Sequence, residues 1–241
     1  MKFKPALIEA RDLNEAYFLL LNACWDNGIK YSITEGSNKG GHRLELPFAA
    51  GFIHYPQTRP LAPIMPEGIS PTTTDEKIQE YFLEYLMNPS LKENEEYKYA
   101  TWINGELFNK YKEDPWESQL EWCIRHLKEK GYGNNHCFIT VGSPSINFNY
   151  DAPYSNETER KTSPCLRGID IKIKDGQVIL GVVYRSWDLF AGFPENMGGF
   201  TLLNEYIASE LGIEPGPLTF SSQGLHCYSY QISSIVKYLR R

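Results

Sequence analysis

The segment around Cys165 contains the residue types that a covalent nucleophile needs. Cys165 follows a proline in the run Ser163-Pro164-Cys165, and a proline favours extended backbone beside it. We therefore expect the thiol to lie at the entrance to a strand, where a substrate can reach it. Only the thiolate form of a cysteine is nucleophilic, so a nearby cation that lowers the thiol pKa would support this role. The alternative is a small buried apolar residue, the usual state of a free cysteine.

Arg185 and Ser186 are predicted to lie next to this thiol. The dipeptide Asp175-Gly176 between two β-rich runs is typical of a two-residue hairpin turn. Strand pairing through that turn places Cys165 opposite Ser186 and beside Arg185. The guanidinium would lower the pKa of the thiol, and the arginine fork together with the serine hydroxyl can hold a phosphate. An ordinary surface arginine at the end of a strand is the competing interpretation.

Asn196 has a side chain that can recognise a base. It lies in the glycine-rich run 192–200, directly before a helical pattern, where it could simply cap the helix. A carboxamide also offers a donor and an acceptor, and so pairs with an imide edge such as N3–H and O4 of uracil. A carboxylate would suit cytosine better, because it accepts from an exocyclic amine. Spacing alone leaves both roles open.

The composition indicates one folded domain that binds a small ligand. Of the 241 residues, 41% are hydrophobic and 22% are charged, which suits a packed core and argues against disorder. We expect a single domain over residues 1–241. The net charge of -6 gives no general attraction for a polyanion, so a nucleic acid polymer or an anionic membrane is not expected as a partner. A small phosphorylated ligand needs only one or two placed cations.

The cysteine pattern and the N-terminus bear on location. The five cysteines are scattered, with no CxxC pair, so we expect neither a disulfide framework nor a metal site, and a reducing cytoplasm fits best. Residues 1–10 lack the basic and apolar regions of a secretory signal. No stretch approaches the length of a membrane span.

Hydrophobic periodicity predicts the elements that must position these side chains. Strand patterns include a hairpin over 169–186 and an earlier strand or hairpin interrupted near Pro47, and 56–71 is expected to be a surface connection. The fold class is therefore α+β, with an antiparallel or mixed sheet and helices packed on it. The predicted helices cover 8–25, 75–88, 116–130 and 200–212, and the predicted strands cover 43–55, 137–142, 169–186 and 219–232.

The stretch from about residue 164 to residue 231 resembles the C-terminal half of thymidylate synthase, particularly its shorter archaeal-type branch. Residue order and spacing agree throughout the run that begins CLRGIDIKIKDGQVILGVVYRSWDLFAGFPENMGGFTLLNEY. The resemblance implies a twisted, mainly antiparallel or mixed sheet with helices packed on one face. It also implies a homodimer in which the partner completes each active site.

The resemblance assigns roles to particular side chains. In the family the cysteine of the Pro-Cys pair attacks C6 of dUMP, and Cys165 matches it. The other matches are Arg185 and Ser186 for the phosphate, Asp188 for the folate pterin, Asn196 for the uracil, and His226 with Tyr228 for the sugar hydroxyl.

The implied reaction converts dUMP to dTMP. Thiolate addition at C6 turns C5 into an enolate, which can attack methylenetetrahydrofolate or a related pterin. Donors near O4 stabilise the charge that develops. Elimination from C5 and hydride transfer from the folate would then release dTMP and dihydrofolate.

Two further catalytic residues are expected upstream, where the likeness is weaker. The family has a glutamate on an early helix that organises proton transfer through water, and Glu80 or Glu84 is expected to fill that place, although either could be a surface residue. A family tyrosine assists proton removal from C5, and Tyr99 matches it in a run where Ala100 replaces the family glycine.

The sequence departs from the family pattern at several positions. Two arginines that bind phosphate from the partner subunit are missing at residues 134–137, so other cations must help Arg185. The usual histidine after the nucleophile is Leu166, and the chain stops at Arg241 without the segment that closes over folate. These last two departures put the reductive half-reaction in question. The candidates for the missing cations are Lys39, Arg43, Arg160 and Lys161.

Three alternatives stay open at this level. A pyrimidine nucleotide hydroxymethylase of the same superfamily, acting on dUMP, dCMP or CMP, would use the same thiol and folate but let water capture the methylene. Asn196 argues against the cytosine version. A cysteine hydrolase could use Cys165 and His226 with Asn196 as the orienting residue. A catalytically silent nucleotide-binding homologue would not need to retain the thiol.

Overall fold

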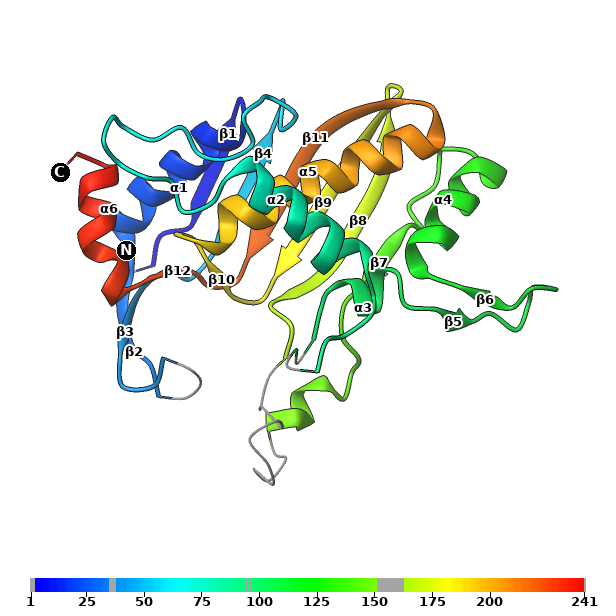
Figure 1. The fold of residues 1–241 in the computed structure, drawn as a ribbon, viewed down its shortest axis with the longest axis horizontal. Helices are drawn as coiled ribbons and strands as arrows, with labels where there is room; N and C mark the ends of the chain where they lie inside the picture. The colour runs from blue at the N-terminus through cyan, green and yellow to red at the C-terminus, as the bar shows by residue number, and fades with distance from the viewer. Residues whose placement is uncertain (1–2, 35–37, 94, 96, 151–162, 241) are drawn as a thin grey trace.

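The computed structural model describes residues 3–34, 38–93, 95, 97–150 and 163–240. Its centre is a mixed six-stranded sheet in the order β1-β4-β11-β9-β8-β7, and helices α2 and α5 lie across one face of strands β8, β9 and β11 (Figure 1). The α+β class expected from the sequence is confirmed. The strands are β1 (Ala6–Ala10), β4 (Ala49–Ile53), β7 (Phe138–Thr140), β8 (Leu166–Lys174), β9 (Gln177–Tyr184) and β11 (Glu214–Ser222).

The predicted hairpin is present as β8 and β9, and its register differs by one residue from the simple rule. Asp175 and Gly176 form the turn with φ angles of 50° and 74°, as a two-residue hairpin turn with two left-handed residues requires. Pairing is regular from Lys174 back to Gly168, and an irregularity between Leu166 and Gly168 then shifts the register. A β-bulge of this kind adds one residue to one strand and displaces everything beyond it.

A second, four-stranded sheet brings together short strands from both ends of the chain, in the order β10-β12-β3-β2. The chain forms strands on both sides of Pro47, as the expected interruption requires. These two strands belong to different sheets, so the hairpin alternative over 43–55 is wrong. β3 ends before Pro47, and β4 enters the six-stranded sheet after it. The strands are β2 (Ile29–Ser32), β3 (His42–Leu46), β10 (Trp187–Asp188) and β12 (Leu225–Tyr228), and the separate pair is β5 (Leu107–Phe108) with β6 (Trp116–Glu117).

Side-chain caps mark the starts of several helices. Asp12 caps α1 by accepting from the backbone N–H of Glu15, and Ser118 forms a capping box with Glu121 at the start of α4. The predicted starts at residues 8 and 116 are therefore too early, because β1 and β6 occupy those positions. The helices are α1 (Leu13–Asn27), α2 (Asp75–Tyr81), α3 (Ala100–Ile103), α4 (Gln119–Lys130), α5 (Gly192–Leu211) and α6 (Ile232–Tyr238), with shorter turns η1 (Phe82–Met87), η2 (Ile146–Tyr150) and η3 (Ser229–Gln231).

Helix α5 corrects the sequence prediction most strongly. It starts at Gly192 rather than near Phe200, so the run expected to be a turn forms the first turns of a helix of 20 residues. Two glycines in this run allow α2 to approach closely: a Cβ on Gly198 would lie 2.7 Å from Ile78, and one on Gly199 would lie 2.5 Å from Tyr81. The glycines are therefore contact positions between helices, which a local reading of glycine as a turn signal cannot reveal.

The predicted helix over 75–88 is continuous in space but changes its hydrogen bonding. α2 ends at Tyr81 and passes into a π-helical turn, η1, over Phe82–Met87. In the part of the chain that the structure describes, no helix combines the length and apolarity needed to cross a membrane.

Candidate active site

Cys165 lies at the entrance to β8, as the sequence predicts, and is partly exposed. The other four cysteines are buried. The backbone N–H of Arg185 donates to the carbonyl oxygen of Cys165 at 2.9 Å. Because of the bulge, Cys165 faces Arg185 rather than Ser186, so the predicted pairing is wrong by one residue.

The guanidinium of Arg185 braces the backbone that leads to the nucleophile. Its Nη2 donates to the carbonyl oxygen of Ser163 at 2.7 Å, and its Nε donates to the carbonyl oxygen of Pro164 at 3.2 Å. Arg185 remains exposed, and Ser186 beside it is half-buried. The two phosphate candidates therefore lie next to Cys165 at the ends of the paired strands.

Burial raises the pKa of the Cys165 thiol above its ordinary value, and Arg185 and Arg167 lower it without reversing the shift. The lowering effect of the Arg185 guanidinium that the sequence predicts is therefore present, but the effect of burial on the thiol pKa is larger. A thiolate pays a large solvation cost when its surroundings are apolar or uncharged. Tyr85 and Tyr99 supply such surroundings. Each lies close enough to Cys165 that a negative charge on the thiolate raises the pKa of the tyrosine.

Tyr99, the predicted proton-transfer residue, lies beside the nucleophile. Its hydroxyl oxygen accepts from the backbone N–H of Leu166, the residue after Cys165, at 3.4 Å. Its ring packs edge-on against Tyr85 with centroids 5.2 Å apart. Burial raises the pKa of Tyr99 well above the ordinary phenol value, so the hydroxyl stays protonated at neutral pH and can serve as a hydrogen-bond donor.

Asn196 lies in the first turns of α5, and its carboxamide is held by a side chain. The indole Nε1 of Trp187 donates to its Oδ1 at 2.8 Å. The residue that flanks the helix start is Ala191, which makes no side-chain cap, so Asn196 is not the N-cap. Trp187 is nearly buried and stacks on Tyr184 with centroids 3.8 Å apart. The sequence prediction gave Trp187 no role, although it lies inside the RSWD run that carried the phosphate residues.

The second sheet aligns three of the other predicted residues. Asp188 on β10 pairs in register with His226 on β12, and His226 pairs with Glu45 on β3. Tyr228 follows two residues later, so its side chain is on the same face, and its ring meets that of His226 edge-on at 4.9 Å. Residues far apart in sequence thus form one row across this sheet.

His226 is set up as a neutral hydrogen-bond acceptor. Its Nδ1 lies 3.0 Å from the carbonyl oxygen of Gly224, so Nδ1 carries the proton and Nε2 has a free lone pair. Nε2 is buried and has no hydrogen-bond partner among the described residues. Burial lowers the pKa of His226 to about 4. A hydroxyl group of a ligand would satisfy Nε2, which the sequence-based assignment to a sugar requires.

Asp188 lies next to His226, on the neighbouring strand β10. Its Oδ1 accepts from the backbone N–H of Phe190 at 3.0 Å and of Ala191 at 3.5 Å, and the Gln231 amide lies 3.4 Å from both carboxylate oxygens. Burial raises the pKa of Asp188. Gln231 is a contact of this carboxylate that the sequence analysis missed, because it comes from η3, beyond β12.

Glu80 does not join this group. It is exposed on α2, whereas Glu84 pairs with Lys92 at 3.6 Å and Lys98 at 4.0 Å. The helix turns Tyr81 toward α5 instead. A helical period of three to four residues from the buried Ile78 is the signal that identifies Tyr81 as the inward position.

The structure describes two of the four residues that could supply additional cations for the phosphate. Arg43 pairs with the buried Glu45 at 2.7 Å, in register with Tyr228. Lys39 is exposed. Arg160 and Lys161 lie outside the described residues.

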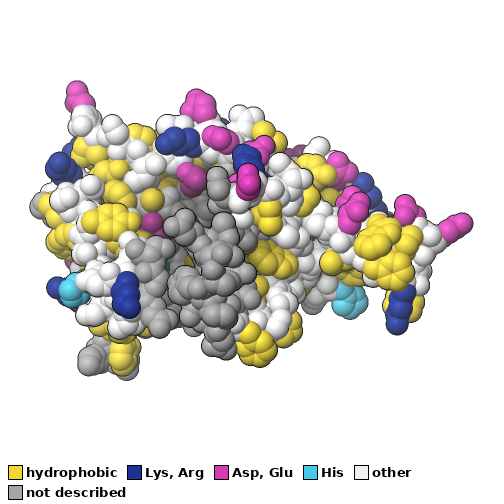
Figure 2. All heavy atoms as spheres, turned by 60° about the horizontal axis from the view of Figure 1, so that its bottom comes forward, with side chains coloured by type: hydrophobic (Ala, Val, Ile, Leu, Met, Phe, Trp, Pro, Cys, Tyr) yellow, Lys and Arg dark blue, Asp and Glu magenta, His cyan; other side chains and the backbone are white. Residues whose placement is uncertain are grey.

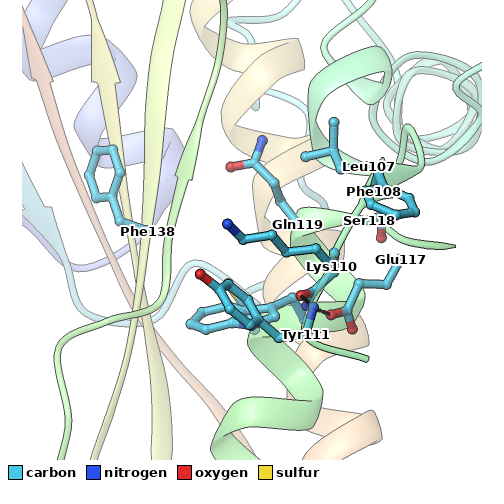
Figure 3. Close-up of a pocket in the computed structure, with 11 residues that line it drawn as sticks. Leu107, Phe108, Lys110, Tyr111, Glu117, Ser118, Gln119 and Phe138 are labelled. Carbon is cyan, nitrogen blue, oxygen red and sulfur yellow. Dashed lines mark hydrogen bonds between the residues drawn. The ribbon is translucent and has the colours of Figure 1, made fainter. Parts of the chain in front are cut away.

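A separate pocket of about 470 Å³ lies between the β5–β6 pair, α4 and β7, and none of the predicted site residues lines it. Figure 3 shows Lys110 and Tyr111 on the hairpin side of this pocket and Phe138 across from them. Hydrophobic side chains gather at that end of the molecule (Figure 2), where Phe108, Tyr111 and Trp116 are exposed. Glu117 in the pocket is already bonded to Asn109 and Arg125.

Comparisons with known proteins identify the family of this chain. A family model described as "Thymidylate synthase" matches residues 102–241, more than half of the chain. A Methanosarcina acetivorans protein named "Putative thymidylate synthase" is 27% identical over 234 residues, covering 96% of this chain and 94% of that protein. A Methanosarcina mazei protein of the same name is 26% identical over 239 residues, with 96% and 94% covered.

The fold has a counterpart among solved structures. Thermostable thymidylate synthase A from Bacillus subtilis superimposes with a TM-score of 0.69 at 16% sequence identity, covering 95% of this chain and 84% of that one. This likeness establishes a shared fold, and the resemblance inferred from residues 164–231 is confirmed. The chain belongs to the thymidylate synthase family.

Proposed function

We propose that this protein transfers a one-carbon unit from methylenetetrahydrofolate, or a related pterin, to C5 of dUMP through a covalent bond between Cys165 and C6. The observation that carries the proposal is the placement of the partly exposed Cys165 directly against Arg185. A nucleophile held beside a phosphate-binding cation suits attack on a nucleotide.

Substrate binding uses both sheets. Arg185 and Ser186 hold the phosphate, and His226 with Tyr228 hold the sugar hydroxyl. The free Nε2 of His226 supports this assignment, because a buried acceptor without a partner is stabilised by a hydroxyl donor. Asn196 accepts from N3–H of the uracil.

The chemistry at C5 and C6 follows from these positions. Binding brings C6 against the Cys165 sulfur, which attacks as the thiolate and leaves negative charge on C5 and O4. Because burial raises the pKa of the free thiol, the proton must leave Cys165 during binding or attack. Tyr99 lies beside Cys165. Its protonated hydroxyl assists proton removal from C5 by donating a hydrogen bond to an ordered water, which accepts the C5 proton.

Asp188 is the residue that would hold the pterin. Its carboxylate is partly buried and is only partly satisfied, by two backbone N–H groups and the more distant Gln231 amide. A carboxylate with remaining acceptor capacity fits a pterin edge, which presents N–H donors. The carbon donor supplies the methylene group and, for the synthase reaction, the hydride.

The wider description is part of the same proposal. The protein acts as a single domain over residues 1–241, as a homodimer and in the cytoplasm. It needs no metal ion, nucleic acid polymer or membrane. The partner subunit is expected to supply cations near the phosphate, because the arginine pair is missing at residues 134–137.

A hydroxymethylase is the second candidate. The residue after the nucleophile is Leu166, which is fully buried, so a side chain that could organise water and protons at this position is replaced by an apolar one. This difference bears on the fate of the methylene rather than on the attack at C6. Asn196 favours dUMP over a cytosine nucleotide in either case.

One assay decides between these activities. The protein is incubated with methylenetetrahydrofolate and dUMP, dCMP, UMP or CMP, and both dihydrofolate absorbance and nucleotide mass are followed. The synthase produces a methylated nucleotide and dihydrofolate, and a hydroxymethylated product without dihydrofolate contradicts it. Cys165→Ala is expected to reduce tritium release from C5 at least about 1,000-fold, whereas Cys123→Ala, at a buried cysteine, should retain it.

A further inference from the structure

The packing of α2 on α5 places Tyr81 next to Asn196, the residue proposed to bind the uracil. Ile78 contacts Gly198, and Tyr81 contacts Gly199, where a Cβ would lie only 2.5 Å from its Cδ1. Gly199 is three residues after Asn196, so both are on one face of α5. Tyr81 also stacks on Tyr85 with centroids 5.3 Å apart, which leaves its ring little freedom.

The carboxamide of Asn196 is held between two side chains. Its Oδ1 accepts from the indole of Trp187 at 2.8 Å. Its amide end lies near the Tyr81 hydroxyl, where it lowers the phenol's pKa against the stronger effect of burial. The Tyr81 oxygen is buried and makes no well-formed hydrogen bond among the described residues, so it has capacity for another partner.

The chemistry of a buried phenol limits what Tyr81 can do. Burial raises its pKa well above the ordinary value, so it cannot act as a base at neutral pH. A phenol oxygen can accept one hydrogen bond while its O–H donates another. Such a group, placed between an amide N–H and a carbonyl oxygen, passes polarisation from one to the other without transferring a proton.

We propose that Tyr81 is a pyrimidine-contacting residue whose hydroxyl accepts from the Asn196 amide and donates to O4 of the uracil, while Asn196 Oδ1 accepts from N3–H. This assignment rests on the proposed function and deepens it. It replaces the glutamate expected at Glu80 with a neutral donor. The donor stabilises the charge that develops on O4 when Cys165 adds to C6, and it selects a 4-keto group over a 4-amino group.

The test compares Tyr81→Phe with a control variant, Tyr206→Phe. Tyr206 is part of α5, but its hydroxyl lies near Glu121 and Glu210 and not near the proposed uracil site. Tritium release from C5 of dUMP is expected to fall about 100-fold in Tyr81→Phe, with dUMP affinity changed only a few-fold. Tyr206→Phe should match the wild type. Circular dichroism and the dUMP affinity verify that each variant is folded.

A substrate analogue separates contact from structure. In 4-thio-dUMP a weaker sulfur acceptor replaces O4, so wild-type tritium release should slow by roughly 10-fold or more. In Tyr81→Phe the rates with dUMP and 4-thio-dUMP should be similar, so the ratio of the two rates should be closer to one than in the wild type. The variant should also discriminate less than the wild type against dCMP. A purely structural role would lower both substrates' rates equally and leave the ratio as in the wild type.

The outcomes distinguish this inference from the function on which it rests. If the wild type releases tritium from dUMP and Tyr81→Phe keeps the same rate and the same sensitivity to 4-thio substitution, the assignment of Tyr81 is wrong and the proposed function stands. If the wild type releases no tritium from any pyrimidine nucleotide, the proposed function fails, and the assignment fails with it.

Discussion

The backbone N–H of Arg185 lies 2.9 Å from the carbonyl oxygen of Cys165, and the guanidinium of the same arginine holds the carbonyl oxygens of Ser163 and Pro164. Arg185 thus contacts the nucleophile segment through its main chain and its side chain. A residue proposed to bind phosphate is also one that fixes the position of the thiol. Substrate binding and nucleophile placement are therefore coupled through one side chain.

Arg185→Lys tests that coupling. Lysine keeps the charge but loses the planar fork that reaches two carbonyl oxygens at once. We expect dUMP affinity to fall roughly 10-fold, equivalent to about 1.4 kcal/mol, measured by equilibrium titration. Arg125→Lys, which alters an ion pair with Glu117 away from the site, should leave dUMP affinity unchanged. Unaltered affinity in Arg185→Lys would contradict the phosphate role.

The raised pKa of Cys165 predicts an alkaline profile for its reactivity. Alkylation by iodoacetamide should accelerate steadily as the pH rises from 7 to beyond 9, because the thiolate fraction is still increasing at the ordinary thiol pKa of about 9. Mass spectrometry should find one modified cysteine, since the other four are buried, and none in Cys165→Ala. A rate that levels off below pH 8 would show that the arginines outweigh burial.

His226 predicts a pH-dependent loss of stability. Its pKa is lowered from 6.5 to about 4 in the folded state, so the unfolded state binds a proton at a higher pH. The free energy of unfolding should be intact above pH 6.5 and decrease as the pH falls toward 4, by up to about 3 kcal/mol. Urea denaturation at pH 7 and pH 4.5 measures the difference.

His226→Asn is the matched variant for that measurement. Asp188 and Glu45, the register neighbours of His226, have pKa values raised by burial, and they act in the opposite direction because folding favours their protonated forms. The comparison is therefore between proteins. The stability lost from pH 7 to pH 4.5 should be smaller in His226→Asn than in the wild type. Equal losses would rule out a buried neutral imidazole.

Gly199→Ala tests the close approach of α2 to α5. The added Cβ would lie 2.5 Å from Tyr81 Cδ1 and 3.2 Å from Leu86 Cδ1, so the stacked tyrosines must move. Overpacking of this kind costs about 1–3 kcal/mol of unfolding free energy, and tritium release should fall with it. Gly133→Ala meets nothing within 4 Å and should stay within about 0.5 kcal/mol of the wild type.

Local sequence signals succeeded where one interaction decides the structure. The Asp175-Gly176 turn needs two left-handed residues, and that pair supplies them, so the hairpin was predictable. Helix starts were predictable only to within several residues, because β1 and β6 precede their caps and the sequence pattern does not separate the two. The start of α5 was missed because its glycines contact α2 rather than form a turn.

The sequence by itself determined the family and the identity of the candidate nucleophile, which depend on residue order along residues 164–231. It also determined the α+β class, which depends on hydrophobic periodicity along the whole chain. Only the tertiary structure decided which neighbours face Cys165. The bulge in β8 shifted its partner to Arg185, and burial beside Tyr85 of η1 and Tyr99 before α3 raised its pKa. Similarly, the helical phase of α2 turned Tyr81 inward and left Glu80 in solvent. The local helical period relates Tyr81 to Ile78, but which face of α2 is buried depends on its contact with α5. Register and desolvation likewise depend on contacts between distant segments, and no local pattern encodes them.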